Sequence, residues 1–204
     1  MRTKIDLESW SRKDHFNFFK NFEEPFFGAT VEIDCEKAFN YCKANNESFF
    51  LYYLYQSLKA ANRVKPFKYR IVENEVYAYD TVNASPTINR PDDTFGFAYM
   101  DFKPTFGEFK KDATAEIDRV QNSTGLVPAV SGENVIHYSS IPWLKFTSLS
   151  HARSFKFKDS CPKISFGKMD KYKMPVSIHV HHALMDGKSV GEFVDVFQNL
   201  MNAN

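Results

Sequence analysis

The stretch best suited to chemistry is Val176–Gly187, where three histidines lie close to an aspartate. β-Branched residues alternate with polar ones as far as His181, which is the period-two pattern of a strand with one buried face. The alternation puts His182 on the apolar side where the strand pattern stops, so its imidazole would meet whatever cleft opens there. Histidine is the side chain best able to take and return a proton near neutral pH. Asp186 follows four residues later, and Gly187 marks a turn before a helical pattern.

Two other interpretations of these histidines remain open from the residues alone. A histidine at a strand end is more often a structural residue than a catalyst. His179, His181 and His182 could also form a metal cluster, but successive strand residues point to opposite faces and cannot converge on one ion without a bulge. No CxxC or HExxH spacing occurs nearby. The sequence therefore predicts no metal site.

Length and composition predict a single domain over residues 1–204, with a substantial core. A formal net charge of +1 gives no general argument for nucleic acid or an anionic membrane as partner. No apolar run reaches the ~18 residues of a membrane-spanning helix, and the N-terminus lacks an apolar signal region. Cys35, Cys42 and Cys161 form neither a disulfide nor a metal pattern and suit a reducing cytoplasm. The 21 phenylalanines and 10 tyrosines would readily build aromatic pockets and subunit interfaces.

Apolar periodicity predicts the elements that would position the histidine stretch. Helices are expected from residue 13 (Ser11 as N-cap, ended by Pro25), from Asp34 as cap through Cys42, from Ser48 through Ala61, from Phe106 to Val120 and from Val190 to Met201. Strands are expected at 5–10 (or an extended lead-in), 27–33, 69–72, 76–79, 86–89, 95–102, 135–139, 144–149, 164–168 and 174–181. Residues 123–132 are expected to form a surface loop.

The order of these elements is irregular, with several expected hairpins and no regular βαβ rhythm. No repeat, low-complexity segment or linker divides the chain. This arrangement predicts an α/β protein of the α+β type, in which helices cover one face of a mixed β-sheet as a two-layer sandwich.

Four segments in order resemble the chloramphenicol acetyltransferase family. His181–Gly187 (HHALMDG) matches the HHxxxDG signature of CoA-dependent acyltransferases. Trp10–Phe16 resembles the family's Trp-x-Arg-(Lys/Arg)-Glu-His-Phe segment, Ile141–Ser148 its Pro-Trp-x-x-Phe-x-Ser segment, and Ser165–Lys168 its Thr-Met-(Gly/Ala)-Lys segment. The resemblance spans nearly the whole chain and implies the CoA-dependent acyltransferase fold.

The resemblance also implies a mechanism. His182 would be the general base that takes the proton of a substrate hydroxyl while this oxygen attacks the thioester of acetyl-CoA. A hydrogen bond to its other ring nitrogen would fix the tautomer. Ser148 would donate a hydrogen bond to the tetrahedral oxyanion and so contact the coenzyme's acyl group. Asp186 and Arg12 would pair to brace the site.

Weaker matches supply further candidates. Ser165 stands where the family has threonine, so a role in the oxyanion network could survive. Phe27 and Phe95 fall near aromatic positions that line the acceptor pocket, although single phenylalanines in such a chain are more commonly core. Lys168 would contact the phosphates of the coenzyme.

The departures from the family surround the acceptor pocket. Leu149–His151 follows Ser148 where the family has Phe-Asp/Asn, Met185 replaces a cysteine, and Lys188–Ser189 replaces an aromatic residue and a histidine. Because substrate identity is decided by pocket contacts, the resemblance predicts the type of reaction better than it predicts the acceptor.

Three hypotheses follow. The first is an acetyl-CoA-dependent O-acetyltransferase acting on chloramphenicol, which would confer antibiotic resistance. The second keeps the mechanism but uses another hydroxyl or amine acceptor, or a longer acyl group. The third is a non-catalytic relative that binds acyl-CoA or a small ligand. The resemblance also implies a homotrimer in which His182 of one subunit faces Ser148 of its neighbour, with no nucleic-acid or membrane partner.

Overall fold

The computed structural model describes residues 1–126, 132–154, 156 and 158–203. Its elements in chain order are β1 (Arg2–Lys4), α1 (Lys13–Phe19), β2 (Phe26–Asp34), α2 (Glu36–Ala44), α3 (Phe49–Arg63), the 3-10 helix η1 (Lys65–Lys68), β3 (Tyr69–Val72), β4 (Glu75–Tyr79), β5 (Asn83–Asn89), β6 (Phe95–Phe97), α4 (Phe106–Gln121), β7 (Val135–Ser140), β8 (Lys163–Phe166), β9 (Lys173–His181) and α5 (Gly187–Met201). None of the helices in the described part is long and apolar enough to cross a membrane.

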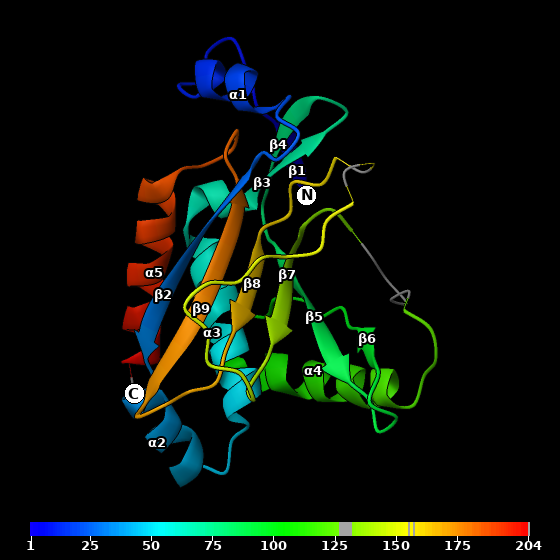
Figure 1. The fold of residues 1–204 in the computed structure, drawn as a ribbon, viewed down its shortest axis with the longest axis vertical. Coiled ribbons are helices and arrows are strands. Elements are labelled where there is room, and N and C mark those ends of the chain that lie inside the picture. Colours follow the sequence, from blue (N-terminus) through cyan, green and yellow to red (C-terminus); the bar gives the residue numbers. More distant parts are fainter. Residues whose placement is uncertain (127–131, 155, 157, 204) are drawn as a thin grey trace.

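The main sheet is mixed, as the sequence predicts. Its strand order is β2-β9-β8-β7-β5-β6. The β7–β8 and β5–β7 pairs are parallel, whereas β2–β9, β8–β9 and β5–β6 are antiparallel. Helices α3, α4 and α5 cover one face of this sheet (Figure 1). A smaller sheet, β1-β4-β3, lies beside it.

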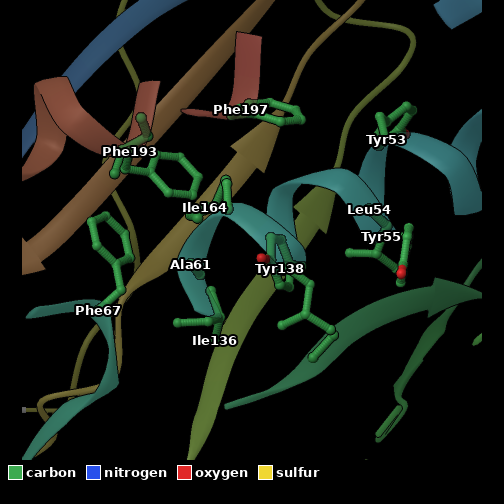
Figure 2. Packing of buried hydrophobic residues seen from close by; sticks show 14 of the residues in the cluster. Tyr53, Leu54, Tyr55, Ala61, Phe67, Ile136, Tyr138, Ile164, Phe193 and Phe197 are labelled. Carbon is green, nitrogen blue, oxygen red and sulfur yellow. The ribbon is translucent and has the colours of Figure 1, made fainter. Parts of the chain in front are cut away.

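The core fills the space between the sheet and these helices. Phe166 of β8 contacts Tyr53 of α3 and Phe197 of α5, and Ser57 of α3 is within 3.2 Å of the Tyr138 hydroxyl on β7. Burial raises the pKa of Tyr138, so its hydroxyl stays protonated. Figure 2 labels Tyr53, Leu54, Tyr55, Ala61, Phe67, Ile136, Tyr138, Ile164, Phe193 and Phe197 in this core.

The other face of the sheet carries polar side chains in register. His179 of β9 pairs with Lys163 of β8, which pairs with His137 of β7. Two positions away on each of these strands, Ser177, Ser165 and Ser139 form a second row. Because strand residues alternate between faces, both rows lie on the side away from the helices.

The segment between β7 and β8 crosses this polar face (Figure 1). Its beginning is fixed where Leu144 accepts a hydrogen bond from the Lys168 amide at 2.8 Å. Further along, the His151 ring meets the His179 ring edge-on at 4.7 Å. Residues 144–149, which the sequence predicts as a strand, belong to this crossing and form no strand. Only Phe146 among them is buried, so the alternating burial of a strand is missing.

Other differences concern the ends of elements. The strand expected at 5–10 is instead β1, nearer the N-terminus, and the strand expected at 95–102 ends at Phe97. Arg12 and Cys35 occupy the N-cap positions predicted for Ser11 and Asp34. Ser48 does cap α3 as expected, since its hydroxyl accepts from the Leu51 amide. Of the loop predicted at 123–132, residues 127–131 lie outside the described residues, and the others form no helix or strand.

Arg70 of β3 is the largest fully buried side chain in the described core. Its guanidinium donates hydrogen bonds to the carbonyl oxygens of Glu133, Val135, Phe67 and Tyr69, at 2.6 to 2.9 Å. The planar fork of arginine therefore joins the small sheet to the start of β7.

Replacing this group should unfold the chain more easily. Arg70→Met removes the guanidinium from four carbonyl oxygens, and although the Cys161 thiol still donates to that of Glu133, we expect the change to lower the free energy of unfolding by at least about 3 kcal/mol. Urea unfolding followed by circular dichroism measures the change. The exposed Arg63→Met, at the end of α3, is the control and should shift stability by less than about 0.5 kcal/mol. Equal effects of the two variants would contradict the role assigned to Arg70.

Candidate active site

His182 lies one residue beyond β9, at the end of the sheet where β2 begins. Its amide donates to the carbonyl of Pro25 at 2.8 Å, which extends the β2–β9 pairing by one position. The imidazole stacks on Phe19 of α1 at 4.0 Å between ring centroids and lies 4.7 Å from the Phe27 ring. Nδ1 is buried and forms no hydrogen bond with any described residue. Two aromatic rings therefore orient the imidazole, rather than the expected hydrogen bond.

An ion pair braces the backbone beside this ring. Arg12 Nη1 donates to Asp186 Oδ2 at 2.7 Å, so the pairing predicted from the sequence is confirmed. Arg12 Nη2 donates to the carbonyl of His182 at 3.3 Å. Oδ1 of Asp186 accepts from the amides of Lys188 and Ser189 and caps α5. The hydrogen bond from Arg12 is the largest cause of a lowered pKa of the Asp186 carboxyl.

His181 points elsewhere and has a structural environment. Its Nδ1 accepts from the Ala183 amide at 3.2 Å, and its ring meets Phe26 edge-on at 5.4 Å. Burial, assisted by the positive charge of Arg153, lowers the pKa of His181 to about 4. This imidazole is therefore neutral at pH 7 and fastens the turn that leads to Asp186.

Ser165 lies far from His182 of the same chain. Ser165 is opposite Ser177 on β9, and His182 is five residues further along, which is roughly 17 Å for an extended strand. The Ser165 hydroxyl is buried and has no hydrogen-bond partner among the described residues. Ser148 is exposed and belongs to the crossing segment, between its contact points at Leu144 and His151.

The two predicted acceptor-pocket residues are separated in one chain. Phe27 touches His182, as described above. Phe95 is on β6 at the opposite edge of the sheet from β2 (Figure 1), is 42% exposed, and contacts Phe97. Phe19 was not singled out by the sequence, because a stacked ring cannot be told from the other phenylalanines without the fold.

Lys168 lies at a large cavity of about 560 Å³ just beyond the end of β8, and residues of α3 and α4 line part of it. Its exposed side chain lies beside aromatic and apolar neighbours that include Phe50, Tyr53 and Trp143. Such a cavity suits a long, largely apolar arm with a negative group near the lysine.

A different group of side chains could hold a metal. His137, Asp159 and Cys161 place one donor atom each within 4.8 Å of one another.

The sequence model of the chloramphenicol acetyltransferase family matches residues 1–198. The chloramphenicol acetyltransferase of Proteus mirabilis is 28% identical over 95% of this chain and 92% of its own length. A solved chloramphenicol acetyltransferase superposes with a TM-score of 0.91 at 29% identity, covering 98% of this chain and all (100%) of the other. The dihydrolipoamide acetyltransferase of Azotobacter vinelandii shares the fold at a TM-score of 0.66 and 11% identity, over 93% and 86% of the two chains.

The fold is that of CoA-dependent acyltransferases, and the chain carries their HHxxxDG segment. Within that class, the match over nearly its whole length shows that this chain belongs to the chloramphenicol acetyltransferase family. It is an acyltransferase of that family.

The Arg12–Asp186 pair predicts a pH-dependent loss of stability. The folded pKa of Asp186 lies below its ordinary value, so the pair contributes above that ordinary value and its contribution is lost as pH falls through the folded pKa. We expect Asp186→Asn to cost about 1 kcal/mol at pH 7, a modest value because the carboxylate is partly exposed, and a smaller amount at pH 3. Urea unfolding at the two pH values measures this. Asp195→Asn, an exposed position on α5, should show no such difference. A pH-independent cost for Asp186→Asn would contradict the assignment.

Proposed function

We propose that this protein transfers the acetyl group of acetyl-CoA to a hydroxyl of chloramphenicol, with His182 as general base. The observation that carries the proposal is the His182 imidazole, held between Phe19 and Phe27 while Arg12 fixes its backbone carbonyl. A base must be held in place before the acceptor binds, because misplacement by about 1 Å can cost a hundredfold in rate.

The reaction balances with the groups available. His182 takes the proton of the acceptor hydroxyl while its oxygen forms a bond to the thioester carbonyl carbon. The tetrahedral oxyanion accepts a hydrogen bond from the Ser148 hydroxyl. Collapse breaks the carbon–sulfur bond, and the imidazolium returns its proton to the departing CoA thiolate. Ser165 would support the oxyanion through its hydroxyl, which lacks another partner among the described residues.

Acetyl-CoA fits the cavity at Lys168. The aromatic lining from Phe50, Tyr53 and Trp143 suits the pantetheine arm, and the exposed ammonium of Lys168 suits the coenzyme's phosphates. The chemistry uses acetyl-CoA as a substrate, and no step requires a metal.

The spacing of these groups supports the trimer with sites at subunit interfaces that the family resemblance implies. In one chain Ser165 is roughly 17 Å from His182 along β9, too far for both to act on one acyl carbon. A neighbouring copy can supply His182 to the Ser148 and Ser165 of the first. Phe95, which is remote from Phe27 in one chain, can line the same acceptor pocket across that interface. Closed threefold symmetry repeats this contact three times.

Removal of the base tests the reaction and the acceptor together. We expect His182→Ala to lower turnover by about 10²–10⁴-fold, because no base then takes the proton of the chloramphenicol hydroxyl in the transition state. The measurement is release of free CoA thiol from acetyl-CoA with chloramphenicol present. His15→Ala, at an exposed histidine on α1, is the matched control and should keep full activity. Near-normal activity of His182→Ala would exclude this mechanism.

The same assay separates the alternatives. Release with another alcohol or amine, but not with chloramphenicol, would keep the mechanism and replace the acceptor. Tight coenzyme binding by calorimetry with no release for any acceptor would favour the non-catalytic relative.

Mixing two inactive variants tests the interface site. Ser148→Ala alone should lose about 10²–10³-fold in turnover, as expected for an oxyanion donor. Random trimers of His182→Ala and Ser148→Ala chains, co-expressed with different tags, should regain about a quarter of the wild-type sites, because each intact site takes His182 and Ser148 from different chains. The control replaces the second chain with the double variant, which can restore nothing. Mixed trimers without recovered activity would place both residues in one chain's site.

A further inference from the structure

The polar face of the sheet contains a group of metal-binding side chains that the acyl-transfer mechanism does not use. His137 is on β7, while Asp159 and Cys161 end the crossing segment just before β8. Their donor atoms all lie within 4.8 Å of one another. The sequence predicted no metal site, because these residues come from separated segments and form no linear motif.

The backbone fixes these side chains near one another. The His137 amide donates to the Pro162 carbonyl at 2.9 Å, which fastens β7 to the residue after Cys161. Asp159 Oδ1 accepts from the Cys161 amide at 2.7 Å. The Cys161 thiol donates to the Glu133 carbonyl at 3.2 Å, and the ring nitrogens of His137 form no hydrogen bond with any described residue. The three donors are therefore held close together before any ion binds.

The donor set selects the metal. One imidazole nitrogen, one carboxylate oxygen and one thiolate sulfur are the ligand types of Zn²⁺. Tetrahedral zinc with bonds of 2.0–2.3 Å places its ligand atoms roughly 3.3–3.7 Å apart. Donors no more than 4.8 Å apart then need to approach by about 1.5 Å at most, which side-chain rotation can supply.

Without a metal ion, the ammonium of Lys163 is the positive charge next to this cluster. Its ammonium forms an ion pair with Asp159 Oδ2 and donates to the Cys161 carbonyl at 3.3 Å. The same ammonium lies 5.1 Å from the Phe26 ring centroid and lines a cavity of about 210 Å³ with His179 and His151. Lys163 can therefore leave Asp159 without losing a favourable environment.

We propose that His137, Asp159 and Cys161 form a zinc site in which Zn²⁺ displaces the ammonium of Lys163. The Cys161 thiol gives up its proton to solvent as the Zn–S bond forms, and Lys163 stays protonated. The thiolate and carboxylate together balance the charge of the ion. Water fills the fourth position. A second cavity of about 270 Å³, lined by Asp159 and Ser160, gives the ion a path to the cluster.

The ion would tie the crossing segment to the sheet. His137 belongs to β7, whereas Asp159 and Cys161 belong to the end of the segment that carries Ser148. The role proposed is structural and does not depend on the proposed acetyl transfer.

Metal titration of the full chain tests the site. The chain is freed of metal with a chelator and titrated with Zn²⁺ against a chromophoric competitor, and then with Co²⁺. We expect one Zn²⁺ per chain, a higher unfolding temperature, and thiolate-to-cobalt charge-transfer absorption with Co²⁺. Cys161→Ser and His137→Gln should each weaken Zn²⁺ binding by about 100-fold or more, and Cys161→Ser should abolish the charge-transfer band. No stoichiometric binding by the wild-type chain would overturn the proposal.

Two further variants separate this site from adventitious binding. Cys42→Ser removes a buried thiol on α2, outside the cluster, and should leave both affinity and absorption unchanged. Lys163→Met removes the competing cation and should tighten Zn²⁺ binding about tenfold or more, an effect that loss of packing would not produce. Equal affinity of the wild type and Cys161→Ser, or weaker binding by Lys163→Met, would show that the ion binds elsewhere.

Discussion

The register of β9 between β2 and β8 is the constraint on which the site depends. Val176, Ile178 and Val180 must face the helices, so the residues between them face the other side. A slip by one residue would exchange the two faces and bury the polar set in the core. The same register decides where the strand ends, and thus where His182 meets the start of β2. Phe19 at the end of α1 and Asp186 at the N-cap of α5 then lie beside this strand end.

The two faces of the sheet differ in whether their buried side chains find partners within one chain. The helical face is apolar and packs against α3, α4 and α5. The other face buries Ser165, Ser177 and Lys163 beneath a crossing segment that has almost no regular structure. A buried hydroxyl without a partner, such as that of Ser165, costs roughly 1–3 kcal/mol and is retained where a ligand or reaction uses it. This difference between the faces is consistent with chemistry and subunit contact on the polar side.

The parts of the fold that could be predicted are those with strong periodicity. The alternation before His182 and the i, i+3, i+4 pattern after Ser48 are each set by one buried face, and both elements were found. Residues 144–149 were wrongly predicted as a strand because hydrophobic content was taken for alternation, whereas only Phe146 is buried. The N-cap of α1 was predicted wrongly because no side chain caps this helix: Arg12 occupies the N-cap position without a side-chain hydrogen bond to the helix.

The candidate site was predictable to the extent that it is local in sequence. His182 and Asp186 lie on one strand end and the following turn, and the family motif added Arg12, whose ion pair with Asp186 is present. Phe19 was missed because its stacking on His182 cannot be inferred from the spacing of residues along the sequence. The His137–Asp159–Cys161 cluster was missed because parallel pairing of β7 with β8 brings it together. Contacts that depend on strand order have no linear signature.

The buried nitrogen of His182 shows how such a site stores free energy for function. Leaving Nδ1 without a hydrogen bond costs roughly 1–3 kcal/mol, and stacking on Phe19 and Phe27 returns only about 0.5–1.5 kcal/mol for each ring pair. The cost of the unpaired Nδ1 and the gain from stacking nearly cancel, so the ring is held in place although one of its nitrogens lacks a hydrogen bond. A group that approached Nδ1, or a neighbouring copy that closed over it, would gain a hydrogen bond to a donor or acceptor already stripped of water. Arg12 keeps the backbone from relaxing to satisfy the nitrogen instead, because it is bonded to the His182 carbonyl and to Asp186 at once. The ion pair thus holds the backbone of His182 in place, and a fixed position of the imidazole is what the proposed general base requires.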